Sequence, residues 1–198
     1  MVEKLLVFFV DSNKPAPKIT IIEEDKSDMV VLNDYIGPER DIISFGEKPV
    51  EVVSHKTGEV FNFSVQVYKI YYSPITSRIS LTANKREVTD TPIHQYIPEF
   101  KETLFEVTSG KQKNYTVKAY VLGKFLDDSV TVERDGFKIN PERLGKEEGE
   151  IIADVSETEI EKAAAKVVKE YFAGEVDKRS EEKRAKIINY INESAPWH

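Results

Sequence analysis

Apolar and polar residues alternate along the first two-thirds of the chain, whereas in the last third apolar residues recur every three or four positions. The alternation is clearest in residues 59–73, whose apolar positions are Phe61, Phe63, Val65 and Val67. A period of two places such side chains on one face of a strand, and a period near 3.6 places them on one side of a helix. The pattern therefore predicts a β-rich unit followed by helices.

Other stretches contain the β-branched and aromatic residues that are typical of strands. They are residues 5–10, 18–24, 28–36, 49–54, 78–88 and 113–126. The first is predicted to be a buried strand and not a signal peptide, because no small-residue cleavage site follows it. Residues 55–58 predict a hairpin turn in which Gly58 takes a positive φ.

The helical signals begin after residue 90. Pro92 suits the first position of a helix, and Pro98 interrupts it, so two short helical pieces are expected there. The sequence Ser156-Glu157-Thr158-Glu159 is a capping box and predicts the start of a longer helix.

The longer helix has an apolar stripe formed by Ile160, Ala163, Ala164, Val167, Val168, Tyr171 and Phe172. Gly174 is predicted to end it. A second, highly charged helix is expected from about Lys178 to Glu193. Its narrow apolar seam consists of Ile187, Ile188 and Ile191. The predicted fold class is therefore α+β, or mixed α/β, with a sheet backed by helices and a C-terminal helical pair.

The composition of the chain excludes some classes of function. The chain has 198 residues, of which 40% are hydrophobic and 32% charged, an ordinary balance for one large or two small globular domains. Its net charge of -7 disfavours nucleic acid as a partner. The absence of cysteine excludes disulfides and thiol catalysis, and it favours a reducing, cytoplasmic location. No apolar run reaches the ~20 residues of a membrane span.

Common catalytic and binding motifs are missing. None of the nine glycines forms a G-x-G, and there is no P-loop, so the usual phosphate-binding loops are absent. The histidines, His55, His94 and His198, are too scattered for a metal site. No nucleophile elbow accompanies the serines.

Three further groups of residues are given the simplest interpretation. Asp127-Asp128 and Glu147-Glu148 are expected to be solvated carboxylates. A base-stacking platform formed by Tyr68, Tyr71 and Tyr72 stays an alternative to simple packing, which is favoured because few basic residues lie among them. By local sequence alone, Glu133-Arg134-Asp135 is a surface charge cluster of small energetic weight.

Residues 79–100 and 119–137 together resemble the middle, or transducer, domain of the GHKL ATPases. This superfamily includes gyrase, the ninety-kilodalton heat-shock chaperone, histidine kinases and MutL. Ile97-Pro98-Glu99-Phe100 matches an I-P-E-aromatic helix of the chaperone. Gly123 and Asp127 match the end of a strand, and residues 130–135 overlay a run that reads L-N-I-S-R-E.

Outside these stretches, most of residues 18–196 is similar to bacterial heat-shock-type ATP-binding proteins, which continue with a charged helical pair and end in a segment like YINESAP. The chain departs from the pattern at two places. Gly136-Phe137 replaces a longer apolar continuation, and Thr131 stands where the family has asparagine. The second departure leaves any contact specific to asparagine open.

The resemblance implies a sheet backed by helices, like the second domain of ribosomal protein S-five. It also implies that ATP and magnesium bind a separate N-terminal domain with an E-x-x-x-N helix and a glycine-rich lid, neither of which occurs here. The middle domain of this superfamily contributes one cation to the γ-phosphate. The residue-by-residue match makes that cation Arg134, with no cofactor bound by this chain alone.

The chain is therefore expected to be part of an ATPase and inactive in isolation. Residues 1–17 are expected to link it to the upstream ATP-binding domain, residues 18–150 to form the transducer-like domain, and residues 151–198 to form a helical segment. The upstream domain is the expected partner, while a homodimer and a protein client are left open. The rival hypothesis is an interaction module that uses the sheet edge or the seam of Ile187, Ile188 and Ile191.

Overall fold

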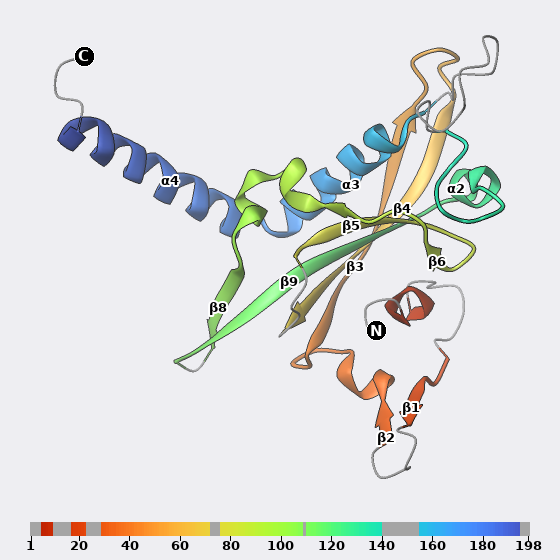
Figure 1. Cartoon of the computed structure of the whole chain (residues 1–198), viewed down its shortest axis with the longest axis horizontal. Coiled ribbons are helices and arrows are strands. Elements are labelled where there is room, and N and C mark those ends of the chain that lie inside the picture. Colours follow the sequence, from red (N-terminus) through yellow and green to blue (C-terminus); the bar gives the residue numbers. More distant parts are fainter. Residues whose placement is uncertain are drawn as a thin grey trace.

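A computed structural model describes residues 5–9, 17–22, 29–71, 76–108, 110–139 and 155–194. In these residues the chain is a mixed α+β structure, with a sheet backed by helices and two helices at its C-terminal end (Figure 1). The predicted fold class is thus confirmed. The predicted loop at residues 140–150 lies outside the described residues.

The strands occupy the first two-thirds of the chain. They are β1 (Thr20–Ile22), β2 (Met29–Val31), β3 (Ile42–Val53), β4 (Val60–Tyr71), β5 (Arg78–Ala83), β6 (Arg86–Glu87), β7 (Thr91–Pro92), β8 (Leu104–Thr108) and β9 (Lys111–Leu122). The α-helices are α2 (Lys124–Ser129), α3 (Glu157–Tyr171) and α4 (Ala173–Ser194), and the 3₁₀ helices are η1 (Val7–Phe9), η2 (Leu32–Tyr35), η3 (Ile93–Gln95) and η4 (Pro98–Lys101).

The main sheet has the strand order β3-β4-β9-β5-β6, with β7 paired to β5 and β8 paired to β9. Only the β5–β9 pairing is parallel among the described strands, so the carboxyl ends of these two neighbours lie at the same end of the sheet. The strands β1 and β2 form a separate antiparallel ribbon.

The edge strand β3 begins earlier than predicted. It starts at Ile42 and not at Pro49, because a bulge between Ser44 and Gly46 shifts the register and interrupts the alternation that sequence analysis relies on. Pro49 lies within the strand, which is compatible with an edge position, since proline has no N–H to donate.

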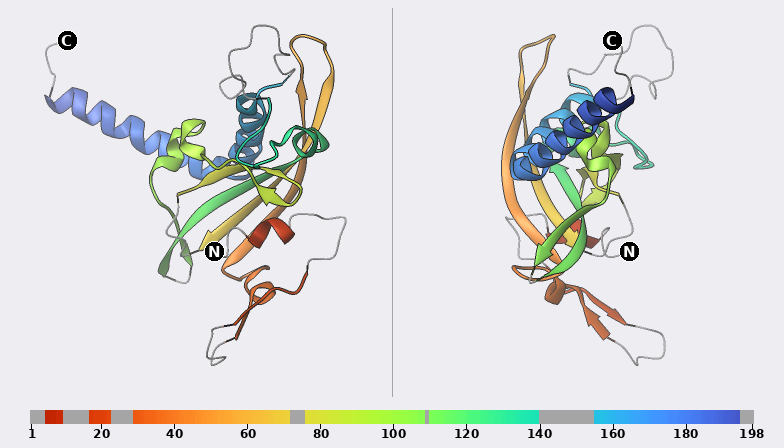
Figure 2. Two further views of the ribbon diagram at one scale, coloured as in Figure 1. Left: turned by 45° about the vertical axis from the view of Figure 1, so that its right-hand side comes forward. Right: turned by 90° about the vertical axis from the view of Figure 1, so that its left-hand side faces the viewer.

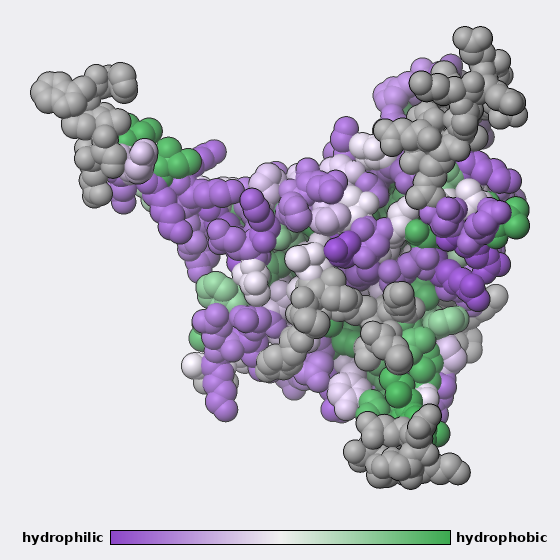
Figure 3. Space-filling view, viewed as in Figure 1, coloured by the Kyte–Doolittle hydropathy of each residue, from purple (hydrophilic) through white to green (hydrophobic). Residues whose placement is uncertain are grey.

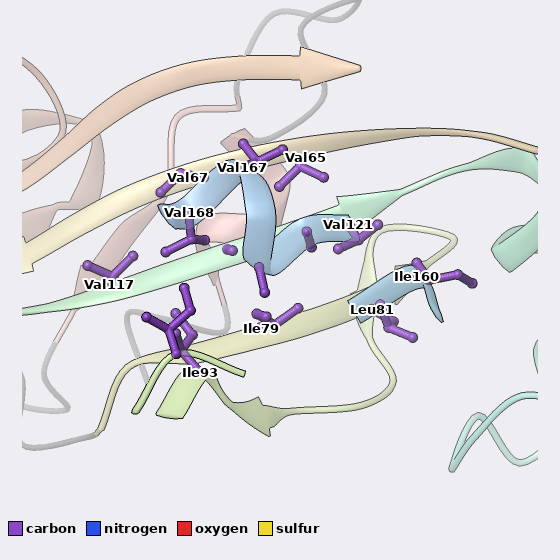
Figure 4. Close-up of a cluster of buried hydrophobic side chains, with 14 of the residues drawn as sticks. Val65, Val67, Ile79, Leu81, Ile93, Val117, Val121, Ile160, Val167 and Val168 are labelled. Carbon is purple, nitrogen blue, oxygen red and sulfur yellow. The ribbon is translucent and has the colours of Figure 1, made fainter. Parts of the chain in front are cut away.

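One face of the sheet is covered by α3. Val167, Val168 and Ile160 of this helix point toward valines, leucine and isoleucine of β4, β9 and β5 (Figure 4). The capping box is confirmed, because the Ser156 hydroxyl accepts from the Glu159 amide and the Glu159 carboxylate accepts from the Ser156 amide. Local sequence and tertiary burial therefore agree on where α3 begins.

The opposite face is covered by the N-terminal segment (Figure 2, left panel). Leu6 and Val7 are buried there against Tyr68, Ile70 and Tyr120. The predicted strand at residues 5–10 is wrong, because Leu5 to Phe9 are helical and bury a compact pair of side chains without pairing to a neighbour. The predicted strand at residues 28–36 also ends early, where Leu32 turns inward and η2 begins.

The other local predictions had mixed outcomes. The turn at residues 55–58 is confirmed, with φ +74° at Gly58, and the two short helical pieces around Pro98 are η3 and η4. Pro92 does not take the first helical position, because it pairs with β5 as the last residue of β7 and η3 begins one residue later.

Strand β8 was not predicted, and the strand predicted at residues 113–126 ends at Leu122, since residues from Lys124 onward form α2. Gly174 does not end a helix: the chain turns at Phe172 and α4 starts at Ala173, because buried Phe172 and Val176 hold the turn against the core.

Helix α4 is attached to the body by its first half only. The Arg179 guanidinium donates to the carbonyl oxygens of Glu99, Glu102 and Thr103 at 2.8, 3.2 and 2.7 Å, and the Ser180 hydroxyl donates to the Glu99 carboxylate. Residues 181–191 are exposed, and Figures 1 and 2 show this half of the helix extending away from the sheet. In the described part of the chain, no helix is long and apolar enough to cross a membrane.

Candidate functional site

The candidate site begins where the chain leaves β9. Gly123 lies so close to β4 that an added Cβ would stand 2.7 Å from Phe63 Cδ1 and 3.1 Å from the Asn62 carbonyl oxygen. The next residues form α2, in which Phe125 packs on Phe61 with 4.6 Å between ring centroids. Close packing at Gly123 therefore fixes where α2 starts.

Residues 130–137, the Arg134 loop, follow α2 and are closed at their base. Val130 and Phe137 form an isolated antiparallel bridge, and the Lys138 amide donates to the Ser129 carbonyl at 2.8 Å. Leu126 and Phe137 are fully buried on either side of the loop. The core therefore holds both ends of the loop.

Thr131 organises the interior of the loop. Its amide donates to the Gly136 carbonyl at 3.0 Å, and its carbonyl accepts from the Arg134 amide at 3.1 Å. Its hydroxyl accepts from the Asp135 amide and lies within hydrogen-bond distance of Asp135 Oδ1 and the Gly136 carbonyl. Thr131 therefore closes a local turn, as Ser and Thr side chains often do.

Arg134 is exposed at the tip of this loop and has φ +57°, in the left-handed region that L residues seldom adopt. Among the residues that the structure describes, its guanidinium has no hydrogen-bond or ion-pair partner. Its neighbours Glu133 and Asp135 are also exposed. The predicted site residue thus presents its side chain to solvent from a loop with a fixed base. The role proposed for it stays a prediction.

The β5–β6 turn lies beside α2. The Asn84 amide donates to Asp127 Oδ1 at 2.7 Å, and the Asn84 side-chain amide donates to the Asp127 carbonyl oxygen at 3.5 Å. Asn84 and Lys85, the two turn residues, both have positive φ, at +50° and +62°. Asp127, predicted to be merely solvated, therefore joins two segments that are 43 positions apart.

The remaining sequence candidates do not converge. His55 is exposed and lies 3.1 Å from Glu159, His94 is half-buried, and His198 is outside the described residues. No group of three or more ligating side chains suited to a metal is found in the described residues. Asp128 is exposed on α2, and Glu147 and Glu148 are outside the described residues.

The tyrosines of β4 are part of the core. Tyr68 is buried edge-on against Tyr120, with 5.9 Å between ring centroids, and Tyr71 is buried against Tyr115. Burial raises the pKa of Tyr68 to about 12. Packing, the favoured interpretation, is therefore correct for these two rings, and Tyr72 lies outside the described residues.

Two buried lysines, which sequence patterns did not indicate, lie away from the Arg134 loop. Lys118 donates to Glu87 at 3.1 Å and to Asp90 at 2.8 Å, which connects β9 to β6 and to the segment that follows β6. Lys69 pairs with Glu106 of β8 and lies 3.9 Å from the centre of the Tyr115 ring. Both lysines satisfy their charge within the fold, which is typical of structural ion pairs.

Comparisons of the chain with protein families, curated proteins and solved structures find no match. The chemistry of the site is therefore inferred from its residues and their geometry alone. The site consists of the exposed guanidinium of Arg134 on a loop that is anchored at its base, and it lies next to the β5–β6 turn.

Proposed function

We propose that this chain is the transducer-like domain of an ATPase and that Arg134 contacts the γ-phosphate of a nucleotide held by a separate, upstream domain. The observation that carries the proposal is the exposed, unpaired guanidinium, within the described residues, on a loop whose base is fixed by Leu126 and Phe137. This arrangement agrees with the position that the resemblance to GHKL ATPases assigns to a phosphate-binding cation.

The physical basis is the charge that develops during hydrolysis. As the terminal phosphoryl bond breaks, negative charge builds on oxygen atoms, and a guanidinium offers a fork of N–H donors that meets two of them at once. A loop closed by Thr131 and anchored in the core loses little conformational entropy when it meets the nucleotide.

Delivery from a second domain makes hydrolysis conditional on domain closure. The nucleotide state would then set how the two domains dock, and α2 and β9, which carry the loop, would pass that change into the sheet. ATP and magnesium belong to the upstream domain in this proposal. The chain alone is expected to bind ATP negligibly and to hydrolyse none.

The test is Arg134→Ala in the protein that contains both domains. Hydrolysis is expected to slow by about 10³-fold or more, as for arginines supplied to other nucleotide hydrolases, with ATP affinity nearly unchanged. Arg134→Lys keeps the charge but loses the fork, and it is expected to restore only part of the rate. Lys138→Ala, an exposed cation at the loop's base, is the matched control and should retain turnover.

An interaction module is the second candidate function. Ile187, Ile188 and Ile191 are 57%, 56% and 52% exposed on the free half of α4, where Figure 3 shows apolar surface near the end of the helix. Such a seam suits dimerisation or the binding of a protein client. Unchanged turnover in Arg134→Ala would contradict the ATPase proposal and leave this candidate.

A further inference from the structure

Strand β8 forms an open edge of the sheet. Among the described strands it pairs with β9 alone, and two residues separate its last residue, Thr108, from the paired Lys111 of β9. A hairpin with a two-residue connection closes with a hydrogen-bonded pair. Because hydrogen-bonded and non-hydrogen-bonded pairs alternate along an antiparallel ladder, the backbone N–H and C=O groups of Phe105 and Val107 point away from β9.

The contact between α4 and Thr103 supports this direction. Thr103 directly precedes β8 and lies two positions before Phe105, and its carbonyl oxygen accepts from the Arg179 guanidinium at 2.7 Å. Figures 1 and 2 show that α4 passes the start of β8 and then extends away from it. Helix α4 therefore covers the start of this edge, and the backbone groups of Phe105 and Val107 are left open to a further strand.

The side chains of β8 also favour the addition of a strand. Phe105 and Val107 are 49% and 66% exposed. Glu106 points to the other face of the sheet, where its carboxylate accepts from the Lys69 ammonium group of the same chain. The strand has no proline, and its register with β9 runs without a bulge. An exposed apolar edge of this kind readily pairs with another strand.

We propose that β8 pairs with β8 of a second copy of this chain, antiparallel and with the twofold axis at Glu106. In this register Phe105 of each copy lies opposite Val107 of the other, and both residues direct their backbone groups across the interface. The edge is thus complementary to itself, as a twofold interface requires, and the pairing closes at the dimer. The inference goes beyond the proposed function and does not depend on it.

The charges at the twofold axis are balanced. Glu106 of one copy lies opposite Glu106 of the other, and like charges in this position destabilise a strand pair. Each carboxylate, however, is already paired with Lys69 of its own copy. The axis therefore brings together two anions and two cations.

The end of the edge has charges that suit the same arrangement. The turn of the second copy, with the exposed residue Lys111, would lie beyond Leu104. There, a groove of about 370 Å³ separates β8 from α4. Carboxylates outnumber cations in the lining of this groove, which includes Glu102, Glu175 and Glu182 against Lys178 and Arg179. Opposite charges therefore meet at both ends of the contact between the two copies.

Analytical ultracentrifugation of the 198-residue chain tests the proposal. At about 100 μM, a concentration that populates complexes with a micromolar Kd, we expect a particle of twice the 22.6 kDa of one chain. Val107→Lys places a charge at the edge of both copies, and it is expected to raise the Kd of the dimer by about tenfold or more. Val53→Lys is the matched control, because Val53 is 50% exposed at the end of β3, and it should leave the dimer unchanged.

A single cysteine tests the register. The chain has no cysteine, so Glu106→Cys introduces one thiol in each copy, directly across the axis. Residues of a non-hydrogen-bonded antiparallel pair have Cα atoms about 4.5 Å apart, which lies within the range of disulfides. Mild oxidation is expected to give a covalent dimer on a non-reducing gel, and Val53→Cys is expected to give far less of it.

Three outcomes overturn the proposal. The first is a parent chain that stays monomeric at about 100 μM, and the second is a dimer that persists unchanged in Val107→Lys. In the second case, loss of the dimer in Ile188→Lys would assign the contact to the free half of α4. The third is cross-linking of Glu106→Cys that is no greater than that of Val53→Cys. None of these outcomes bears on the proposed function, which is decided by the turnover of Arg134→Ala.

Discussion

At the scale of single residues, Gly123 controls where the chain leaves the sheet. Its missing Cβ allows β9 to pass directly over Phe63, and the contact involves a ring carbon and a backbone oxygen that have little room to move. The position of α2, and with it the Arg134 loop, depends on this close approach. Any larger residue at this position forces a shift in β4, in α2 or in both.

Gly123→Ala is therefore expected to lower the free energy of unfolding by about 1–3 kcal/mol, the usual range for overpacking in a close-packed core. Chemical denaturation of the two chains measures this difference. Gly174→Ala is the control, because nothing lies within 4 Å of its added Cβ and the residue is helical, so that variant should gain up to about 1 kcal/mol. A neutral Gly123→Ala would contradict the packing argument.

Some residues of the candidate site were accessible from the sequence and others were not. Arg134 was identified through the run that resembles the chaperone pattern, and the structure shows that it is exposed, while its role stays a prediction. The role of Thr131 depends on a turn that forms only when Val130 and Phe137 meet. The Asn84–Asp127 bond joins distant segments, and no local pattern encodes such a pairing.

At the scale of elements, β8 is held by an ionic contact as well as by its pairing with β9. Glu106 of β8 accepts hydrogen bonds from Lys69 and from the Tyr71 hydroxyl, both of β4. Burial acts to raise the pKa of Glu106, but the hydrogen bonds from Lys69 and Tyr71 outweigh it and the pKa is lowered. The contact therefore bridges strands that are not neighbours in the sheet.

Because the folded state lowers this pKa, ionised Glu106 stabilises the fold above its unfolded value near 4.5, and the stabilisation is lost as the pH falls through the folded value. Glu106→Gln is expected to be less stable than the parent chain at pH 7, and the difference should shrink below about pH 4.5. Urea unfolding at several pH values measures this convergence. A difference that does not change with pH would show that the carboxylate charge plays no part.

Element prediction succeeded where local signals matched tertiary packing. The capping box and the apolar stripe of α3 are both local, and the structure has both. Strand β8 was missed because Leu104 is its only buried residue, so its sequence has little alternation of apolar and polar positions. The first half of β3 was missed because the bulge at Ser44 and Gly46 breaks the period of two.

At the scale of the whole molecule, the sheet has an apolar cluster on each face. The larger one lies under α3, and the smaller one joins the N-terminal segment to Tyr68, Ile70 and Tyr120. Strands β4 and β9 are therefore covered on both sides, although sequence alternation alone suggested one buried face. The polar residue Gln66, on the same face of β4 as Tyr68 and Ile70, is buried for this reason. Lys69 is buried on the other face, where it lies over the Tyr115 ring and pairs with Glu106.

Leu6→Ala is expected to cost about 2–5 kcal/mol in the free energy of unfolding, the usual range for removing a fully buried leucine side chain. Thermal or chemical unfolding measures it. Phe8 is 39% exposed on the same segment, and Phe8→Ala should cost less than Leu6→Ala. Equal and small effects would mean that the N-terminal segment adds little to the second cluster.

The exposed edge of β3 is unsuited to the addition of a strand from another protein. Three features of β3 disfavour the addition of another strand. Pro49 has no N–H to donate, and the register shifts between Ser44 and Gly46. The strand also carries the charged residues Glu47, Lys48 and Glu51. Natural sheets use these same devices against unwanted strand addition and amyloid-like stacking. Binding partners are therefore expected to contact β8, the turns and the free half of α4, and not the exposed edge of β3.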